Sequence, residues 1–226
     1  MNPIRSDLAV TSLLSFTSAV TLCAAPTFAS VVTFEDVSTQ AYPASASIAS
    51  AGWITDYAGF AWRGASGNSN PWYAPYSVGV YTPGAVATGY EYGVTSGTHA
   101  AYSSWGAEVS VSRQERWNFD GAYFNAAWNT GLMIRLVGLR GGATVYDTTT
   151  TLGAPTAATW IGAGFTDIDE LRMTASGGSS YGFPNGSGTN FTFDDFTYRA
   201  GGIPAAGTLA LVSAAGFTSR RPRNRR

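Results

Sequence analysis

Short runs of alternating apolar and polar residues, separated by Gly and Asn clusters, fill most of the chain between residues 30 and 199. In "EVSVSR", Val109 and Val111 fall on one face, and in "GLMIRLVGL", Arg135 falls on the face opposite its apolar neighbours. A repeat of two residues is typical of strands that bury one face. The pattern therefore predicts β-strands in this part of the chain.

Further segments have the same length and character. "VVTFED" and "ATVYDTTTTL" are rich in β-branched residues, "DELRMTAS" aligns Leu171 with Met173, and "TNFTFDDFTY" aligns Phe191 with Phe193. No helical stripe of ten or more residues occurs outside the two ends. Many short strands with Gly-rich turns predict an all-β fold, a single two-sheet β-sandwich that is jelly-roll-like and covers residues 30–199.

Composition supports one folded domain. The chain has 226 residues, of which 45% are hydrophobic and 14% aromatic, and it contains 27 glycines. This length buries one sizeable core, and the aromatic content is too high for a disordered chain.

The first 29 residues have the pattern of a secretory signal peptide, which we expect to form a helix. Arg5 supplies the positive start, a mostly apolar stretch follows, and "TFAS" places small residues around a cleavage site after Ala29. Cleavage there removes Cys23, so the mature chain would contain no cysteine. An exported domain without disulfides must depend on its core or on a bound ion.

The last 27 residues, 200–226, have a different character. A short linker leads into an apolar segment at 203–219, and five of the last seven residues are arginines. The 20 uncharged residues before Arg220 would form a helix about 30 Å long, enough to cross a bilayer. A transmembrane-type helix with its arginines left in the cytoplasm is one interpretation, and a basic tail after a Gly-rich linker is the other.

A short Pro motif, an apolar stretch and a terminal Arg cluster, on a chain with a signal peptide, resemble the PEP-CTERM sorting signal. The motif here begins Ile203-Pro204-Ala205 and is closer to the Val/Ile-Pro-Ala-Pro variant than to Pro-Glu-Pro. The resemblance implies sorting by an exosortase-type peptidase, a membrane-held tail, and a destination at the cell surface or in an exopolysaccharide matrix.

The second half of the body carries a further resemblance. "FDGAYFNAAWNTGLMIRLVGLRGGATVYDTTTTL", "FTDIDELRMTASGG" and "FTFDDFTY" are similar to a region found in many exported PEP-CTERM proteins, whose biochemical function is generally unknown. The layout also resembles, more loosely, the jelly roll of carbohydrate-binding modules.

The charge is unevenly distributed along the chain. Between Val31 and Arg199 there are 7 arginines and 13 acidic residues, a balance of −6, and the chain has no lysine. An acidic body between basic ends is expected to repel nucleic acid, so no nucleic-acid partner is predicted.

Most catalytic chemistries lack their residues. His99 is the only histidine, no G-x-S-x-G motif occurs, and the mature chain has no cysteine. These absences exclude paired-histidine metal sites and thiol catalysis. They also leave a serine triad without support. We therefore expect His99 to be an ordinary loop or strand residue. Pairs of carboxylates remain for a glycan hydrolase, but the sequence ranks no pair first.

Two acidic doublets end or occupy predicted strands, namely Glu35 with Asp36 and Asp194 with Asp195. If the first and last strands are neighbours, these carboxylates would repel one another unless a cation joined them, and oxygen ligands select Ca²⁺. A structural Ca²⁺ held by some of the four is one interpretation. The other is that the doublets alternate across their strands and are solvated.

Aromatic residues are concentrated between residues 53 and 81. Trp72 and Tyr73 fall within "GASGNSNPWYAPY", a segment with loop composition, where they could stack on sugar rings. The alternative is that the aromatic residues of this segment fill the core or cover an edge. The sequence thus predicts a non-enzymatic exported surface or matrix protein, with a carbohydrate-binding module as the alternative and a glycan hydrolase as a third candidate.

Overall fold

The structure is a computed structural model. It describes residues 28–38, 40–41, 50–64, 78–82, 88–103, 106–184 and 186–201. Its elements are β1 (Ser30–Val32), β2 (Gln40–Ala41), β3 (Ser50–Ile54), β4 (Asp56–Tyr57), β5 (Phe60–Gly64), β6 (Val78–Thr82), the 3-10 turn η1 (Glu91–Gly93), β7 (Ala100–Ser103), β8 (Val109–Ala126), β9 (Asn129–Arg140), β10 (Ala143–Thr151), β11 (Thr159–Ser180) and β12 (Phe191–Ala200). All strand pairs are antiparallel, and the all-β prediction is confirmed.

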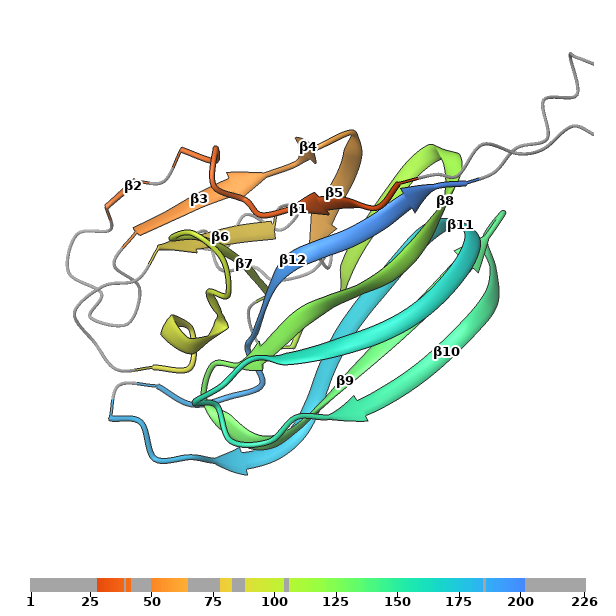
Figure 1. Cartoon of the computed structure of the whole chain (residues 1–226). Helices are drawn as coiled ribbons and strands as arrows, with labels where there is room; N and C mark the ends of the chain where they lie inside the picture. Colours follow the sequence, from red (N-terminus) through yellow and green to blue (C-terminus); the bar gives the residue numbers. More distant parts are fainter. Residues whose placement is uncertain are drawn as a thin grey trace, which may run out of the picture.

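Two long strands, β8 and β11, belong to both layers of the fold (Figure 1). The start of β8 pairs with β5 on one edge and with the middle of β11 on the other, and from there the sheet continues through β9 to β10. The second half of β8 pairs with β12, which is followed by β7, β6, β3 and β2. Bulges between β8 and β11 allow the bend that carries both strands from one layer to the other.

Aromatic rings fill the space between the layers. Trp62 of β5 lies parallel to Phe193 of β12, with ring centroids 6.1 Å apart, although these two strands do not pair. Phe60 meets Trp117 edge to face at 4.9 Å. Each fully buried ring of this size contributes roughly 1.5–3 kcal/mol through the area that it removes from water.

A bulge in β12 changes which residues face the core. Asp194 pairs with Tyr123, but the next pair is Thr197 with Gly121, and Asp195 between them has a φ of 49°. The extra residue lets Phe193 and Phe196 both point inward, and both are fully buried. Asp194 and Asp195 consequently stay together on the outer side of the strand.

The segment 88–99 covers part of that outer side. Tyr90, Tyr102 and Trp128 form a small second core there with Ala127. Gly93 lies so close to β12 that a Cβ at this position would be 1.9 Å from the Thr192 hydroxyl oxygen. This cover explains why Asp194, which faces away from the main core, is nevertheless buried.

The two ends of the described body lie together. Ser30 of β1 pairs with Tyr198 of β12, so β1 and β7 follow one another along the same edge of β12 (Figure 1). The predicted signal peptide, residues 1–29, lies outside the described residues except for its last two positions, and the predicted apolar segment 203–219 lies outside them entirely. Within the described ranges, no helix combines the length and apolar character that a membrane span needs.

Candidate functional site

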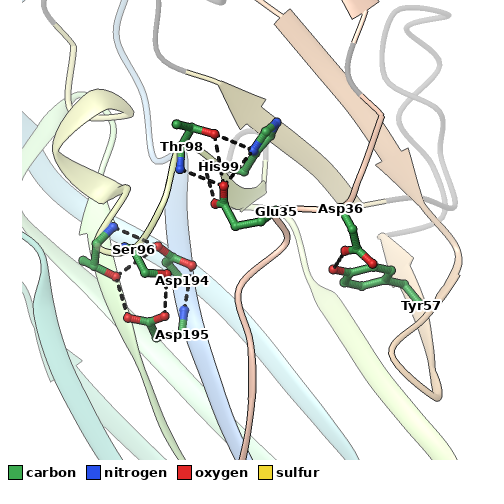
Figure 2. Close-up of polar contacts among 9 residues, drawn as sticks. Glu35, Asp36, Tyr57, Ser96, Thr98, His99, Asp194 and Asp195 are labelled. Carbon is green, nitrogen blue, oxygen red and sulfur yellow. Dashed lines mark hydrogen bonds and ion pairs between the residues drawn. The ribbon is translucent and has the colours of Figure 1, made fainter.

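The loop 94–99 is held by carboxylates at both of its ends (Figure 2). Asp194 Oδ2 accepts hydrogen bonds from the backbone N–H of Thr95 at 2.8 Å and of Ser96 at 3.0 Å, and its Oδ1 accepts one from the Asp195 N–H at 2.7 Å. Asp195 accepts hydrogen bonds from the hydroxyls of Ser96, at 2.7 Å, and Thr95, at 3.1 Å. Burial raises the pKa of Asp194 to about 6, although the three backbone donors act in the opposite direction.

Glu35 holds the other end of the loop. Its two oxygens accept hydrogen bonds from the backbone N–H of Thr98 at 2.9 Å and of His99 at 2.8 Å. Desolvation opposes ionisation of Glu35, but these bonds and those from the Thr98 and His99 side chains keep its pKa below the usual value. His99 lies just before β7, with Nδ1 3.3 Å from Glu35 Oε2, so it belongs to this structural arrangement.

The four acidic residues predicted to hold Ca²⁺ therefore do not form one group. Asp194 and Asp195 meet one end of the loop, Glu35 meets the other, and Asp36 is directed toward Tyr57 (Figure 2). Among the described residues, no three acidic, His or Cys side chains come together in a way that could hold a metal ion. The expectation that a doublet places one carboxylate on each face is wrong for Asp194 and Asp195, because the bulge turns both toward the loop.

A pocket of about 420 Å³ opens beside β1. Its walls come from β1, the turn that follows, the β4–β5 turn and the end of β12, and they include Val31, Thr33, Glu35, Asp36, Tyr57 and Tyr198. The Tyr57 hydroxyl donates a hydrogen bond to Asp36 Oδ1. Burial, and then this bond to Asp36, raise the pKa of Tyr57 above its ordinary value, so the phenol remains a donor.

Two backbone features with positive φ shape this pocket. Phe34, at φ 63°, turns its ring into the core and directs Glu35 and Asp36 to different sides of the turn. Ala58 and Gly59, at φ 51° and 79°, form the two-residue connection between Tyr57 and Phe60, which pair with each other. Both residues of a type I′ turn need positive φ, so the hairpin ends there and presents Tyr57 at its tip.

An exposed indole lies on the outer face of β11, away from the loop. Trp160 is 42% exposed, and the edge of its ring meets Tyr123 at 5.2 Å. Cβ atoms added to the paired glycines Gly121 and Gly162 would lie 2.7 and 3.2 Å from atoms of this indole. The Nε1 edge of the indole therefore lies against the two glycines, and the side chain remains partly open to solvent.

An ion pair lies next to this indole on the same layer. Arg199 Nε and Nη2 donate to both carboxylate oxygens of Asp120, with the shortest contact at 2.6 Å. Asp120 directly precedes Gly121, and Arg199 lies two residues after Thr197, the residue that pairs with Gly121. The Asp120–Arg199 ion pair consequently borders the two glycines that contact Trp160.

Several predicted site residues lie outside the described residues. Trp72 and Tyr73 fall in the segment between β5 and β6, and Ile203, Pro204 and Ala205 follow the last described position. Ala29, the predicted cleavage position, is exposed immediately before β1. These assignments remain predictions.

The residues that sequence reasoning missed are Tyr57, Tyr198 and Trp160 with its glycines. The only sequence signal for the turn that presents Tyr57 is Gly59, because Ala58 is not a residue type that a two-residue hairpin turn prefers. "TWIGAGF" carried a signal for Trp160, because the alternation puts Trp160 opposite the apolar Ile161 and on the same face as Gly162. The cross-strand partner Gly121 had no sequence signal, because register depends on the bulges.

Comparison with known proteins found likenesses of structure alone. No protein-family model and no curated protein matches the sequence. A DUF4465 family protein from Bacteroides caccae is similar with a TM-score of 0.45 at 12% identity, covering 76% of this chain and 99% of that one. A CBM61 module in complex with β-1,4-galactotriose has a TM-score of 0.34 at 13% identity, covering 64% of this chain and 91% of its own. The CBM51 module of a GH95 protein from Clostridium perfringens, in complex with methyl-galactose, has a TM-score of 0.33 at 8% identity, covering 75% and 99%. The chain is similar to these proteins without being placed in their families.

Proposed function

We propose that the β-sandwich is a non-catalytic carbohydrate-binding module and that the pocket beside β1 is its ligand site. The observation that carries this proposal is the combination, in one pocket of about 420 Å³, of Tyr57 and Tyr198 with the exposed carboxylate of Asp36. Pockets of this size are typical of small-ligand sites, in which a few polar groups orient a ligand against apolar walls.

The chemistry of the pocket matches that of a sugar. The C–H faces of a pyranose pack against aromatic rings, which the two tyrosines supply. Neighbouring sugar hydroxyls donate to a carboxylate, and Asp36 Oδ2 faces no cation, since every arginine of the described body lies in an ion pair with an acidic residue elsewhere. Because its ionisable lining is acidic, the pocket favours neutral glycans over uronic acids.

The geometry favours binding over hydrolysis. A glycosidase places two carboxylates on opposite sides of the bond that it cleaves. Glu35 and Asp36 are successive residues of one turn, and both oxygens of Glu35 accept hydrogen bonds from Thr98 and His99. Asp36 therefore has no second free carboxylate facing it from the lining of this pocket.

The test is retention of the protein in gels that contain soluble polysaccharide. Wild-type protein is compared with Asp36→Ala and, as a matched control, Asp56→Ala, because Asp56 is also exposed but pairs with Arg63 outside the pocket. We expect retention by at least one of galactan, mannan and laminarin, loss of it in Asp36→Ala, and little change in Asp56→Ala. Equal retention of all three proteins, or none by the wild type in any gel, would reject the proposal.

We further propose that this module is exported and sorted at the envelope, where its ligand would be exopolysaccharide. The support is the sequence at the two ends: the stretch before Ala29, and the Ile203-Pro204-Ala205 motif with its apolar segment and arginines. Fractionation of producing cells with intact-mass measurement tests this location. A mass that begins at Ser30, found in envelope or medium, supports it, and a full-length chain in the cytosol rejects it. A producing strain that lacks the exosortase-type peptidase should retain the tail on the recovered protein.

A further inference from the structure

One cross-strand row connects the pocket to the exposed indole. Val31 of β1 pairs with Thr197 of β12, Thr197 pairs with Gly121 of β8, and Gly121 pairs with Gly162 of β11. Val31 lines the pocket and is 52% exposed, so its side chain faces outward at the near end of this row. Gly162 lies against the Nε1 edge of Trp160 at the far end. The four strands lie in this order in Figure 1.

Beyond Val31, the row carries only small residues. Gly121 and Gly162 have no side chains, and the Thr197 hydroxyl donates to the backbone carbonyl of Asp195 at 2.8 Å. Larger polar side chains border the row on both sides. Asp195 with its Ser96 partner stands on one side, and the Asp120–Arg199 pair stands on the other. A narrow strip of small residues between polar borders suits a single extended chain.

Trp160 gives this strip a second contact point. Its indole is fixed along the Nε1 edge by the two glycines and by the edge-to-face contact with Tyr123, so a ligand ring can stack on its exposed part without rearrangement of the side chain. A sugar ring stacked on indole also leaves its hydroxyls free to meet the charged pair at the rim.

From this geometry, and resting on the proposed function, we infer that the glycan runs from the pocket across β1, β12 and β8 to Trp160. Three strand spacings of about 4.8 Å give a path of about 14 Å, which is the length of a trisaccharide. The Asp120–Arg199 pair is neutral as a unit, so it selects hydroxyls rather than a charged group. The ligand class is therefore an unbranched, neutral oligosaccharide of three or more hexoses, bound across the strands.

The test is a length series. Mono- to hexasaccharides prepared from the polysaccharide that retains the wild type in gels are titrated calorimetrically. For wild-type protein we expect affinity to rise until the ligand spans both contact points and then to level off. Trp160→Ala should weaken the longer ligands by about tenfold, the loss of one stacked ring, and leave the monosaccharide unchanged. Asp36→Ala should weaken every length.

Two further variants separate a binding role from a general effect. Gly162→Ala keeps Trp160 but brings a methyl group within 3.2 Å of Nε1, which lifts the indole, so long ligands should again lose affinity. Tyr181→Ala removes an aromatic residue that is 45% exposed in the loop after β11 and should change nothing. Wild-type affinity of Trp160→Ala for the longer ligands overturns the extended path and leaves the pocket intact. If no length binds even to wild type, the proposed function fails as well, and the path fails with it.

Discussion

The ring of Phe34 lies nearly parallel to that of Tyr57, with centroids 5.8 Å apart and planes 25° apart. Phe34 is fully buried and also meets Trp62 and Phe193 edge to face. One face of Tyr57 is thereby fixed by the core, and its hydroxyl is fixed by Asp36. The pocket wall is therefore as rigid as the core behind it.

Replacing Phe34 should damage stability and the pocket together. Phe34→Ala leaves a cavity beneath Tyr57, and we expect a loss of about 3–5 kcal/mol in the free energy of unfolding. Urea unfolding followed by tryptophan fluorescence measures this loss. Val145→Ala, at an exposed position of the edge strand β10, is the control and should cost well under 1 kcal/mol. A loss of similar size in both variants would contradict the packing described for Phe34.

The turn at Ala58 offers a gain in stability. Ala58 has a φ of 51°, a left-handed conformation that disfavours a residue with a Cβ, whereas Asn tolerates it and Asn-Gly is the preferred sequence for this turn. Ala58→Asn should raise the free energy of unfolding by about 0.5–1 kcal/mol, seen as a higher thermal midpoint. A lower midpoint with unchanged spectra would show that the turn has another geometry.

Asp194 should make the protein more stable in mild acid. The pKa of Asp194 is about 6 in the folded chain and near the ordinary 3.8 in the unfolded chain, so the native state binds the proton more tightly. The stabilisation that Asp194 contributes is therefore fully present when the pH is below its pKa in the unfolded chain, and it is lost as the pH rises through about 6. Glu35 contributes in the opposite direction, because its pKa is lowered in the folded chain. Its stabilisation is present at neutral pH and is lost only in more acidic solution.

The measurement is a series of thermal midpoints between pH 5 and pH 7.5. We expect the wild-type midpoint to be higher at pH 5, and Asp194→Asn to lose that dependence. The variant should also be less stable throughout, because an amide cannot accept from Thr95, Ser96 and Asp195 with both of its ends. A wild-type midpoint that rises with pH over this interval would contradict the assigned shift.

Removal of divalent cations should leave the melting midpoint unchanged. Asp194 and Glu35 already accept backbone N–H donors, which occupy the positions that a cation would need. The measurement compares midpoints in EDTA and in added Ca²⁺. A midpoint that falls in EDTA and recovers with Ca²⁺ would restore the sequence-based interpretation of a bound ion between the first and last strands.

The strands themselves were predictable because their pattern of burial is local. Val109 and Val111 are buried and Arg135 is exposed, as the alternation of residues indicated. The approach of the first and last strands was expected from the fold class, and β1 does pair with β12. Local periodicity carries this information because neighbouring side chains in a strand face opposite sides.

The site was not predictable in the same way. The bulge at Asp195 brings two successive carboxylates to one side, and the left-handed Phe34 sends two successive carboxylates to different sides. Asp tolerates the left-handed conformation better than most residues, but Phe does not favour it, so tertiary packing must impose the conformation of Phe34. Similarly, the fixed position of Trp160 is recognisable only once Gly121 is known to lie against its indole, and that depends on long-range register.

The pairing of Ser30 with Tyr198 has a mechanical consequence. Force applied between the two ends of the body would peel β1 from β12 one hydrogen-bonded pair at a time. A load that enters β12 at Ala200 is also carried by its pairing with β8, which extends along much of its length. Detaching β1 would therefore leave β12 held in the sheet by its other edge.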